Sequence, residues 1–210
     1  MSRLSIFPDE SAAHSPNGPM HALESDDPAV IQSELSRRGI GFEQWPAEQG
    51  LPEGADQATI LQAYADAIAR VQRDGGYATV DAIRMTPDHP DREPLRRKFL
   101  EEHTHAEDEV RFFVEGCGLF VLHIGSEVLS VLCERGDLMR VPAGTRHWFD
   151  MGSQPQFCAV RWFNNPEGWV AQYTGSSIAQ RVPRLDCVGV PDTWMRLVRS
   201  VAARVVGEPV

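Results

Sequence analysis

Short segments in which apolar and polar residues alternate occupy much of the second half of the chain. Such alternation is typical of strands with one buried face. Glycine, proline and serine separate the segments, and Gly125-Ser126 fits a two-residue hairpin turn. Several short strands with turns at regular spacing predict an antiparallel barrel or sandwich. The expected strands are 79–85, 110–115, 119–124, 128–134, 138–141, 146–151 and 157–163.

Helical spacing of apolar residues replaces this alternation nearer the N-terminus. One helix is predicted to begin at Asp26 or Asp27, with Pro28 in its first turn, and to end near Gly39. A second helix is predicted over 56–74, capped by its aspartate and ended by a pair of glycines. The remaining expected elements are a strand at 4–7, a loop at 11–21 and a short helix at 95–100.

The last residues, 187–210, carry a different pattern. Trp194, Leu197, Val201 and Val205 recur at helical spacing and predict an amphipathic helix. We expect it to pack on the barrel or on a second subunit rather than to take part in catalysis. The expected organisation is one domain over 1–186, with a barrel core at about 79–170 and N-terminal helices, followed by a C-terminal helical tail at 187–210.

Length and composition fit a single globular domain: the chain has 210 residues, 42% hydrophobic and 24% charged. A net charge of −10 argues against nucleic acid or an anionic membrane surface as a partner. No apolar run approaches the ~18 residues of a membrane span, and acids and a proline come too early for a secretory signal. The four cysteines lack zinc-like or redox spacing, so we expect reduced core thiols in a cytoplasmic protein.

Two histidines one residue apart, His103 and His105, are followed four residues later by Glu109. Residues of a strand alternate faces, so these three odd-numbered side chains would share one face. An inward curl of the sheet would bring His147 to them, from the later segment Pro-Ala-Gly-Thr-Arg-His. Three imidazoles and a carboxylate suit divalent Fe, Ni, Mn or Zn. Four such ligands leave two adjacent positions of an octahedron open to a substrate.

Other interpretations of these histidines stay open. A His-x-His pair can consist of surface residues or hydrogen-bonded core residues. A structural zinc site is the inorganic alternative, but such sites are usually rich in cysteine, and none accompanies the histidines. The remaining histidines have no partner at ligand spacing, and His123, near the predicted hairpin turn, is expected to face solvent. They are His14, His21, His89 and His123.

The spacing of the two histidine segments resembles the cupin superfamily. This resemblance implies a cupin-type, jelly-roll-like antiparallel β-barrel, and it is weak evidence for function because cupins host many activities. The glycine often found six residues before the first histidine is replaced here by Arg97. The positions that match are His103, His105, Glu109 and Gly116 in the first segment, and Gly136, Pro142, Gly144 and His147 in the second.

The sequence around these positions resembles the acireductone dioxygenases. The similar stretches are 99–116, 136–138, 142–150 and 161–169, and a weaker likeness extends over 1–186. The resemblance implies a methionine-salvage enzyme that cleaves the enediol 1,2-dihydroxy-3-keto-5-methylthiopentene with O2. One Fe²⁺ or Ni²⁺ per monomer would give either 4-methylthio-2-oxobutanoate and formate (iron) or 3-methylthiopropanoate, formate and carbon monoxide (nickel). The implied ligands are His103, His105, Glu109 and His147.

Two arginines are candidate catalytic residues. Arg111 lies two residues past Glu109 on the ligand face, and Arg161 shares the parity of Phe157 and Phe163. Either guanidinium could hydrogen bond to an enediolate oxygen or fix a carboxylate. A salt bridge at the mouth of the barrel is the alternative for both.

Three aromatic residues and one acid complete the candidate site. Phe99, Phe149 and Trp169 could form an apolar wall around the methylthio tail, or could be ordinary core. Glu102 could accept a hydrogen bond from a ligand histidine, because such histidines usually donate their other N–H to a carboxylate or carbonyl.

Two other function classes remain compatible with a cupin. A non-catalytic cupin would bind a small acid without taking up O2. A cupin isomerase acting on a sugar or keto acid would form product under argon, where a dioxygenase is silent. In each case we expect a monomer, or an oligomer held together by the tail at 187–210.

Overall fold

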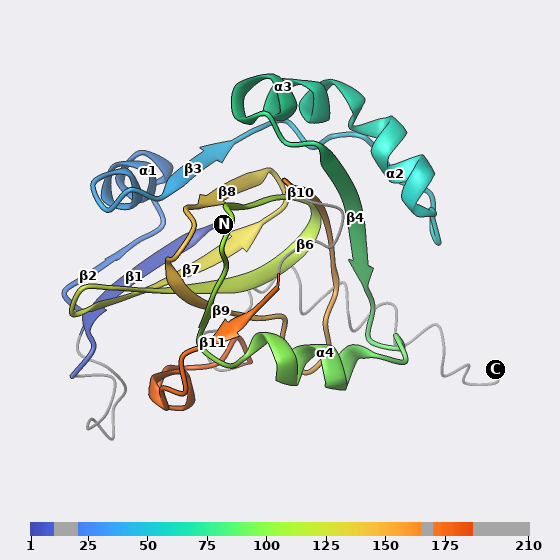
Figure 1. The fold of residues 1–210 in the computed structure, drawn as a ribbon. Helices are drawn as coiled ribbons and strands as arrows, with labels where there is room; N and C mark the ends of the chain where they lie inside the picture. Colours follow the sequence, from blue (N-terminus) through green and yellow to red (C-terminus); the bar gives the residue numbers. More distant parts are fainter. Residues whose placement is uncertain (11–20, 165–169, 187–210) are drawn as a thin grey trace, which may run out of the picture.

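The computed structural model describes residues 1–10, 21–164 and 170–186. Within these ranges, eleven antiparallel strands form one hydrogen-bonded sheet that bends into two layers (Figure 1). The first layer runs β11 (Gln172–Tyr173), β5 (His103–Thr104), β9 (Arg146–Asp150), β6 (Glu109–Ile124), β7 (Glu127–Glu134), β1 (Arg3–Pro8) and β2 (Leu23–Ser25). The second runs β4 (Thr79–Met85), β10 (Phe157–Phe163), β6, β8 (Asp137–Val141) and β3 (Gly41–Gln44).

Strand β6 belongs to both layers, because its first half pairs with β8 and β10 and its second half with β7 and β9. Gly116 has φ of +70°, and the register with β10 shifts just before it, between Phe113 and Glu115. Such a β-bulge turns the side chains that follow it to the opposite face. Odd-numbered Phe113 therefore faces the interior before the bulge, and even-numbered Phe120 and Leu122 face it afterwards.

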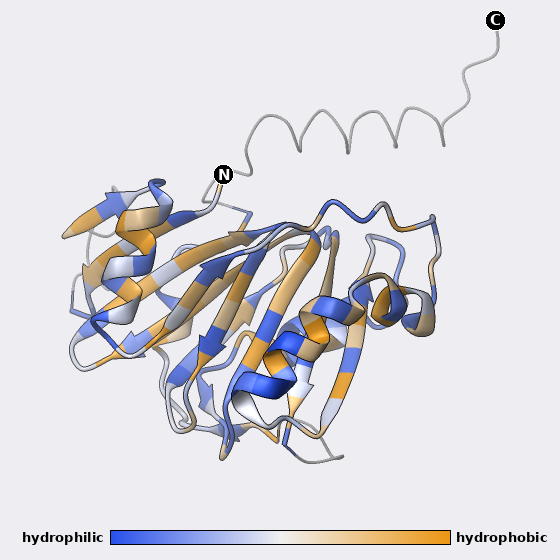
Figure 2. Cartoon of the chain, turned by 90° about the horizontal axis from the view of Figure 1, so that it is seen from above, coloured by the Kyte–Doolittle hydropathy of each residue, from blue (hydrophilic) through white to orange (hydrophobic). Residues whose placement is uncertain are grey.

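The interior between the layers is apolar, and helices or loops cover the outer faces. Helix α1 (Pro28–Ser36) adds Ile31 and Leu35 to the interior core. Helices α2 (Gln57–Ala63) and α3 (Ala65–Gly75) cover the outer face of the second layer. A segment with the 3₁₀ helix Ile178–Gln180 covers the first layer. Hydrophobic residues run along the strands with hydrophilic ones between them (Figure 2). Strands β6 and β7 are buried over nearly all of their length, because both of their faces are covered.

Helix α4 (Arg92–Phe99) lies outside this framework, at the lower end of the view in Figure 1. Arg96 anchors it, with Nε donating to Asp150 at 2.8 Å and Nη2 donating to Asp186 at 2.8 Å. Because Asp150 is the buried last residue of β9, this pairing fixes the helix against the strand that also carries His147.

The structure confirms the mainly-β antiparallel fold, although the described strands do not close into a barrel. Asp27 and Asp56 cap α1 and α2 as expected, and Gly125 and Ser126 connect the hairpin of β6 and β7. The helix predicted over 56–74 is two helices, broken at Tyr64, whose hydroxyl donates to the carbonyl of Gln49 at 3.2 Å. The two strands predicted over 110–124 are one, since the bulge bends β6 without ending it.

The cysteines and the C-terminal tail were also the subject of predictions. Cys117, Cys133 and Cys158 are free and buried, as expected, whereas Cys187 and the predicted tail helix lie outside the described residues. In the ranges that the structure covers, no helix is both long enough and apolar enough to cross a membrane.

Gly116→Ala should destabilise the fold strongly. Alanine is disfavoured at positive φ, and its Cβ would collide with the backbone carbonyl of Gln156. We expect a loss of about 3 kcal/mol in the free energy of unfolding, measured by urea denaturation. Gly125→Ala is the matched control: its φ is +61° but a Cβ would meet nothing within 4 Å. It should cost about 1 kcal/mol; equal losses in the two variants would contradict the role given to the bulge.

Candidate metal centre

The three histidines of the two sequence segments come together at one end of the interior. His103 in β5 pairs directly opposite His147 in β9, and His105 follows β5 in the bend before β6. The ring centroids of His103 and His147 are 4.5 Å apart, and those of His105 and His147 are 5.1 Å apart. All three are buried, and their ligand nitrogens lie within 4.8 Å of one another. This group can hold a metal ion.

Two loop contacts fix this convergence. The amide of Gly144 donates to the carbonyl of His105 at 2.9 Å, and the amide of Ala143 donates to Asp108 Oδ1 at 2.9 Å. The loop that leads into His147 is thereby tied to the bend that follows His105. The chain bends between β5 and β6, and His105 and Glu109, on either side of this bend, approach the same point.

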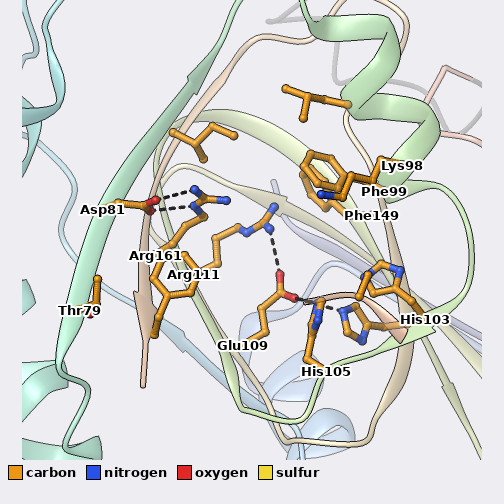
Figure 3. Close-up of a pocket in the computed structure, with 15 residues that line it drawn as sticks. Thr79, Asp81, Lys98, Phe99, His103, His105, Glu109, Arg111, Phe149 and Arg161 are labelled. Carbon is orange, nitrogen blue, oxygen red and sulfur yellow. Dashed lines mark hydrogen bonds and ion pairs between the residues drawn. The ribbon is translucent and has the colours of Figure 1, made fainter. Parts of the chain in front are cut away.

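The carboxylate of Glu109 joins the histidines from the start of β6 (Figure 3). Its Oε2 lies 3.1 Å from His147 Nε2 and 3.3 Å from His105 Nε2, and its Oε1 accepts a hydrogen bond from Arg111 at 2.9 Å. Burial acts to raise the pKa of Glu109, but the charge of Arg111 and the contacts with the histidines outweigh it. They hold the pKa well below its ordinary value, so the carboxylate is ionised at neutral pH.

Backbone carbonyls orient the three imidazoles. A carbonyl oxygen can only accept a hydrogen bond, so each Nδ1 carries a proton and Nε2 is the nitrogen left to face a metal. The Nδ1 contacts are His103 to Glu101 O at 2.6 Å, His105 to Val170 O at 3.1 Å, and His147 to Thr145 O at 2.8 Å.

The residues present fit a divalent metal. Burial lowers the pKa of His103 to about 4, so its imidazole is neutral at neutral pH. Nε2 of His105 and Nε2 of His147 both lie within 3.3 Å of the ionised carboxylate, so a cation placed between these atoms would be bound by all three groups. Neutral imidazoles with one carboxylate suit first-row divalent metals.

A cavity of about 350 Å³ opens beside the histidines. Its wall combines apolar side chains with charged ones, and α4 contributes Leu95, Lys98 and Phe99. Both predicted arginines line it, as do the predicted Phe99 and Phe149, whereas the predicted Trp169 lies outside the described residues. The full lining is Thr79, Asp81, Ile83, Leu95, Lys98, Phe99, His103, His105, Glu109, Arg111, His147, Phe149, Arg161, Phe163 and Ala171.

The two arginines stand side by side in the second layer, each with its own carboxylate (Figure 3). Arg161 of β10 is opposite Asp81 of β4 on one side and Arg111 of β6 on the other. It donates to both oxygens of Asp81, at 2.8 and 2.6 Å, while Arg111 donates to Glu109. The guanidinium of Arg111 also lies over the ring of Phe149, 4.5 Å from its centroid. The paired carboxylates offset the repulsion between the neighbouring cations.

The structure corrects two expectations about buried polar residues. Glu102 is buried, but Oε2 pairs with His123 Nδ1 at 2.7 Å and Oε1 accepts from Thr174 at 2.6 Å, while the ligand histidines use backbone carbonyls. His123, expected to face solvent, is only 8% exposed, and its Nε2 lies 3.4 Å from Asp9. The reason is tertiary, because the end of β1 and the segment at 174 cover this part of the hairpin.

Several cavity residues were missed from the sequence. Asp81 and its neighbours in β4 face the cavity at every second position, from Thr79 to Ile83, so their parity was a usable signal once the strand was placed. Leu95 and Lys98 are brought there by the docking of α4, which no local pattern reveals.

The fold and the site together define a cupin-like protein with a buried centre suited to a divalent metal. A model of the ARD/ARD′ family matches residues 12–171. An acireductone dioxygenase of Synechococcus sp. (strain CC9605) is 90% identical over 186 residues, which cover 89% of this chain and 100% of the relative. One from Prochlorococcus marinus (strain MIT 9313) is 68% identical over 186 residues, covering 88% of this chain and 100% of the relative.

A solved structure gives the same answer. Acireductone dioxygenase from Bacillus anthracis, with a cadmium ion in its active centre, matches with a TM-score of 0.70 and 28% identity, over 82% of this chain and 98% of that one. The chain therefore belongs to the acireductone dioxygenase family and is an oxidoreductase of the dioxygenase type.

His123→Leu should destabilise the protein, because it leaves the Glu102 carboxyl buried without its imidazole partner. We expect a loss of about 3 kcal/mol in the free energy of unfolding. Urea denaturation of metal-free protein measures it without a contribution from metal binding. The control is His21→Leu, whose side chain is exposed and which should change stability by less than about 0.5 kcal/mol. Similar losses of unfolding free energy in the two variants would show that the buried pair of Glu102 and His123 does not stabilise the fold.

Proposed function

We propose that this protein cleaves the acireductone 1,2-dihydroxy-3-keto-5-methylthiopentene with O2, as a step of methionine salvage in the cytoplasm. The observation that carries the proposal is the buried set of three imidazoles and one ionised carboxylate, placed at one end of a cavity large enough for a small metabolite. The names of its relatives support the same substrate class.

The proposed ligands are His103, His105, Glu109 and His147. The cadmium ion in the active centre of the Bacillus anthracis relative supports a divalent metal here, and we propose one Fe²⁺ or Ni²⁺ per monomer. When bound, the metal would hold the enediolate through two oxygens and bring it together with O2. We expect the working unit to be a monomer.

The arginines have different proposed roles. Arg111 holds Oε1 of Glu109 and thereby keeps Oε2 aimed at the histidines. Arg161 is held rigidly by both oxygens of Asp81 on the cavity wall. Two fixed cations in a partly enclosed cavity would stabilise negative charge on a bound enediolate without having to reorient.

The apolar wall has room for the substrate's tail. Phe149 is buried and Phe99 is half-buried, and both line the cavity together with Ile83 and Leu95. We propose that these side chains receive the methylthio group and exclude water from the enediolate. Trp169 is proposed as a further part of this wall from its sequence position alone.

His103→Ala and Glu109→Ala should each lower the metal content and the rate of enediol consumption in air. The loss of rate should exceed the roughly 10- to 100-fold that is typical when a hydrogen-bond partner of a metal ligand is removed. Metal analysis and O2 uptake measure the two effects. His89→Ala, which alters a histidine outside the cavity, is the control and should retain both properties. Unchanged turnover in either variant would show that the substituted residue is not a metal ligand.

The bound metal should decide the products. Protein loaded with iron should release 4-methylthio-2-oxobutanoate and formate, whereas protein loaded with nickel should release 3-methylthiopropanoate, formate and carbon monoxide. Gas chromatography for carbon monoxide and mass spectrometry for the acids distinguish the two routes. Under argon neither form should consume the enediol, and product formation there would instead favour an isomerase.

A further inference from the structure

Lys98 is the only lysine in a chain that otherwise uses arginine for every cationic side chain, with 20 lysines and arginines in total. It lies near the end of α4 and is exposed, yet it lines the cavity. Figure 3 shows its side chain among those that line the cavity. The lysine therefore stands at the mouth of the site.

The charges around the cavity single out this side chain. The lining contains three cations and two carboxylates. Glu109 pairs with Arg111 and Asp81 pairs with Arg161, whereas Lys98 forms no ion pair with any described residue. The cavity thus keeps one uncompensated positive charge, which is suited to an anionic ligand.

The proposed substrate supplies a matching group. Its three oxygens lie on adjacent carbons, and a metal that chelates two of them leaves the third to be satisfied by the protein. We propose that the ammonium of Lys98 binds this third oxygen of the enediolate and so selects substrates with an oxygen function next to the chelating pair. This inference rests on the proposed function and assigns Lys98 a role in binding the substrate.

Contacts of α4 with the rest of the protein hold the backbone of Lys98 in place beside the cavity. The helix is fixed by the ion pairs of Arg96, and the carbonyl of Lys98 accepts a hydrogen bond from the hydroxyl of Tyr173 at 3.4 Å. The backbone is therefore held in place, while the flexible four-carbon stem allows the ammonium to follow the oxygen.

Lys98→Met, which removes the charge and keeps the length, should raise KM for the enediol roughly 10- to 100-fold, the range expected for a hydrogen bond to a charged group. Metal content and kcat should change little, because the contact exists in both the bound substrate and the transition state. Lys98→Arg should recover most of the loss. The control is Arg97→Met, which neutralises the neighbouring exposed cation outside the cavity and should leave KM unchanged.

The single lysine permits a second readout that does not depend on turnover. Acetylation of metal-loaded protein by an N-hydroxysuccinimide ester under argon can modify only Lys98 and the amine of Met1 among its amines. Saturating enediol should protect Lys98, whereas the amine of Met1, which pairs with Glu134 outside the cavity, should react equally with and without it. Mass spectrometry of the two peptides gives the ratio.

The outcomes separate this inference from the proposed function. If the parent protein consumes enediol and O2 but Lys98→Met keeps a KM within twofold of the parent, the role of Lys98 is wrong and the function stands. Acetylation of Lys98 that is unaffected by enediol leads to the same conclusion. If the parent protein consumes no enediol, the proposed function and this inference fail together.

Discussion

The left-handed backbone at Gly116 is the constraint on which the two-layered arrangement depends. It lets β6 serve both layers, and it reverses the side of the strand that faces inward. Glu109 and Arg111 can therefore point into the cavity from the first half of β6, while Phe120 and Leu122 fill the interior from the second half. A regular strand of this length would send one of these sets outward.

The second constraint is the cost of burying charged side chains, and ion pairs between neighbouring side chains offset that cost. Glu109 and Arg111 are each at most 5% exposed, a location where an unpaired charge is very costly. Their mutual contact keeps both ionised, and the same logic joins Asp81 to Arg161 at the cavity wall. The ionised Glu109 then faces the three imidazoles, and a divalent cation bound between them would meet a negative charge there. The structural pairs thus prepare the site for a metal.

The candidate metal site could be predicted largely from the sequence, because it depends on the local spacing of its residues. His103, His105 and Glu109 follow one another closely enough that few backbone conformations separate them, and the proline-glycine segment marked His147 as their partner. Strand periodicity gave most of the sheet for the same reason. The break at Tyr64 was not readable, since the periodicity of apolar residues continues through it and the contacts of its hydroxyl lie about fifteen residues earlier in the chain.

The sequence by itself determined which donors are available, which glycines can turn the chain, and which faces of the strands are apolar. Only the tertiary structure decided the partners: the carbonyls that orient the imidazoles, the burial of His123 against Glu102, the pairing of Arg161 with Asp81, and the place of Lys98 at the cavity. Periodicity is a property of a few neighbouring residues, whereas these contacts join residues that chain folding brings together from distant positions.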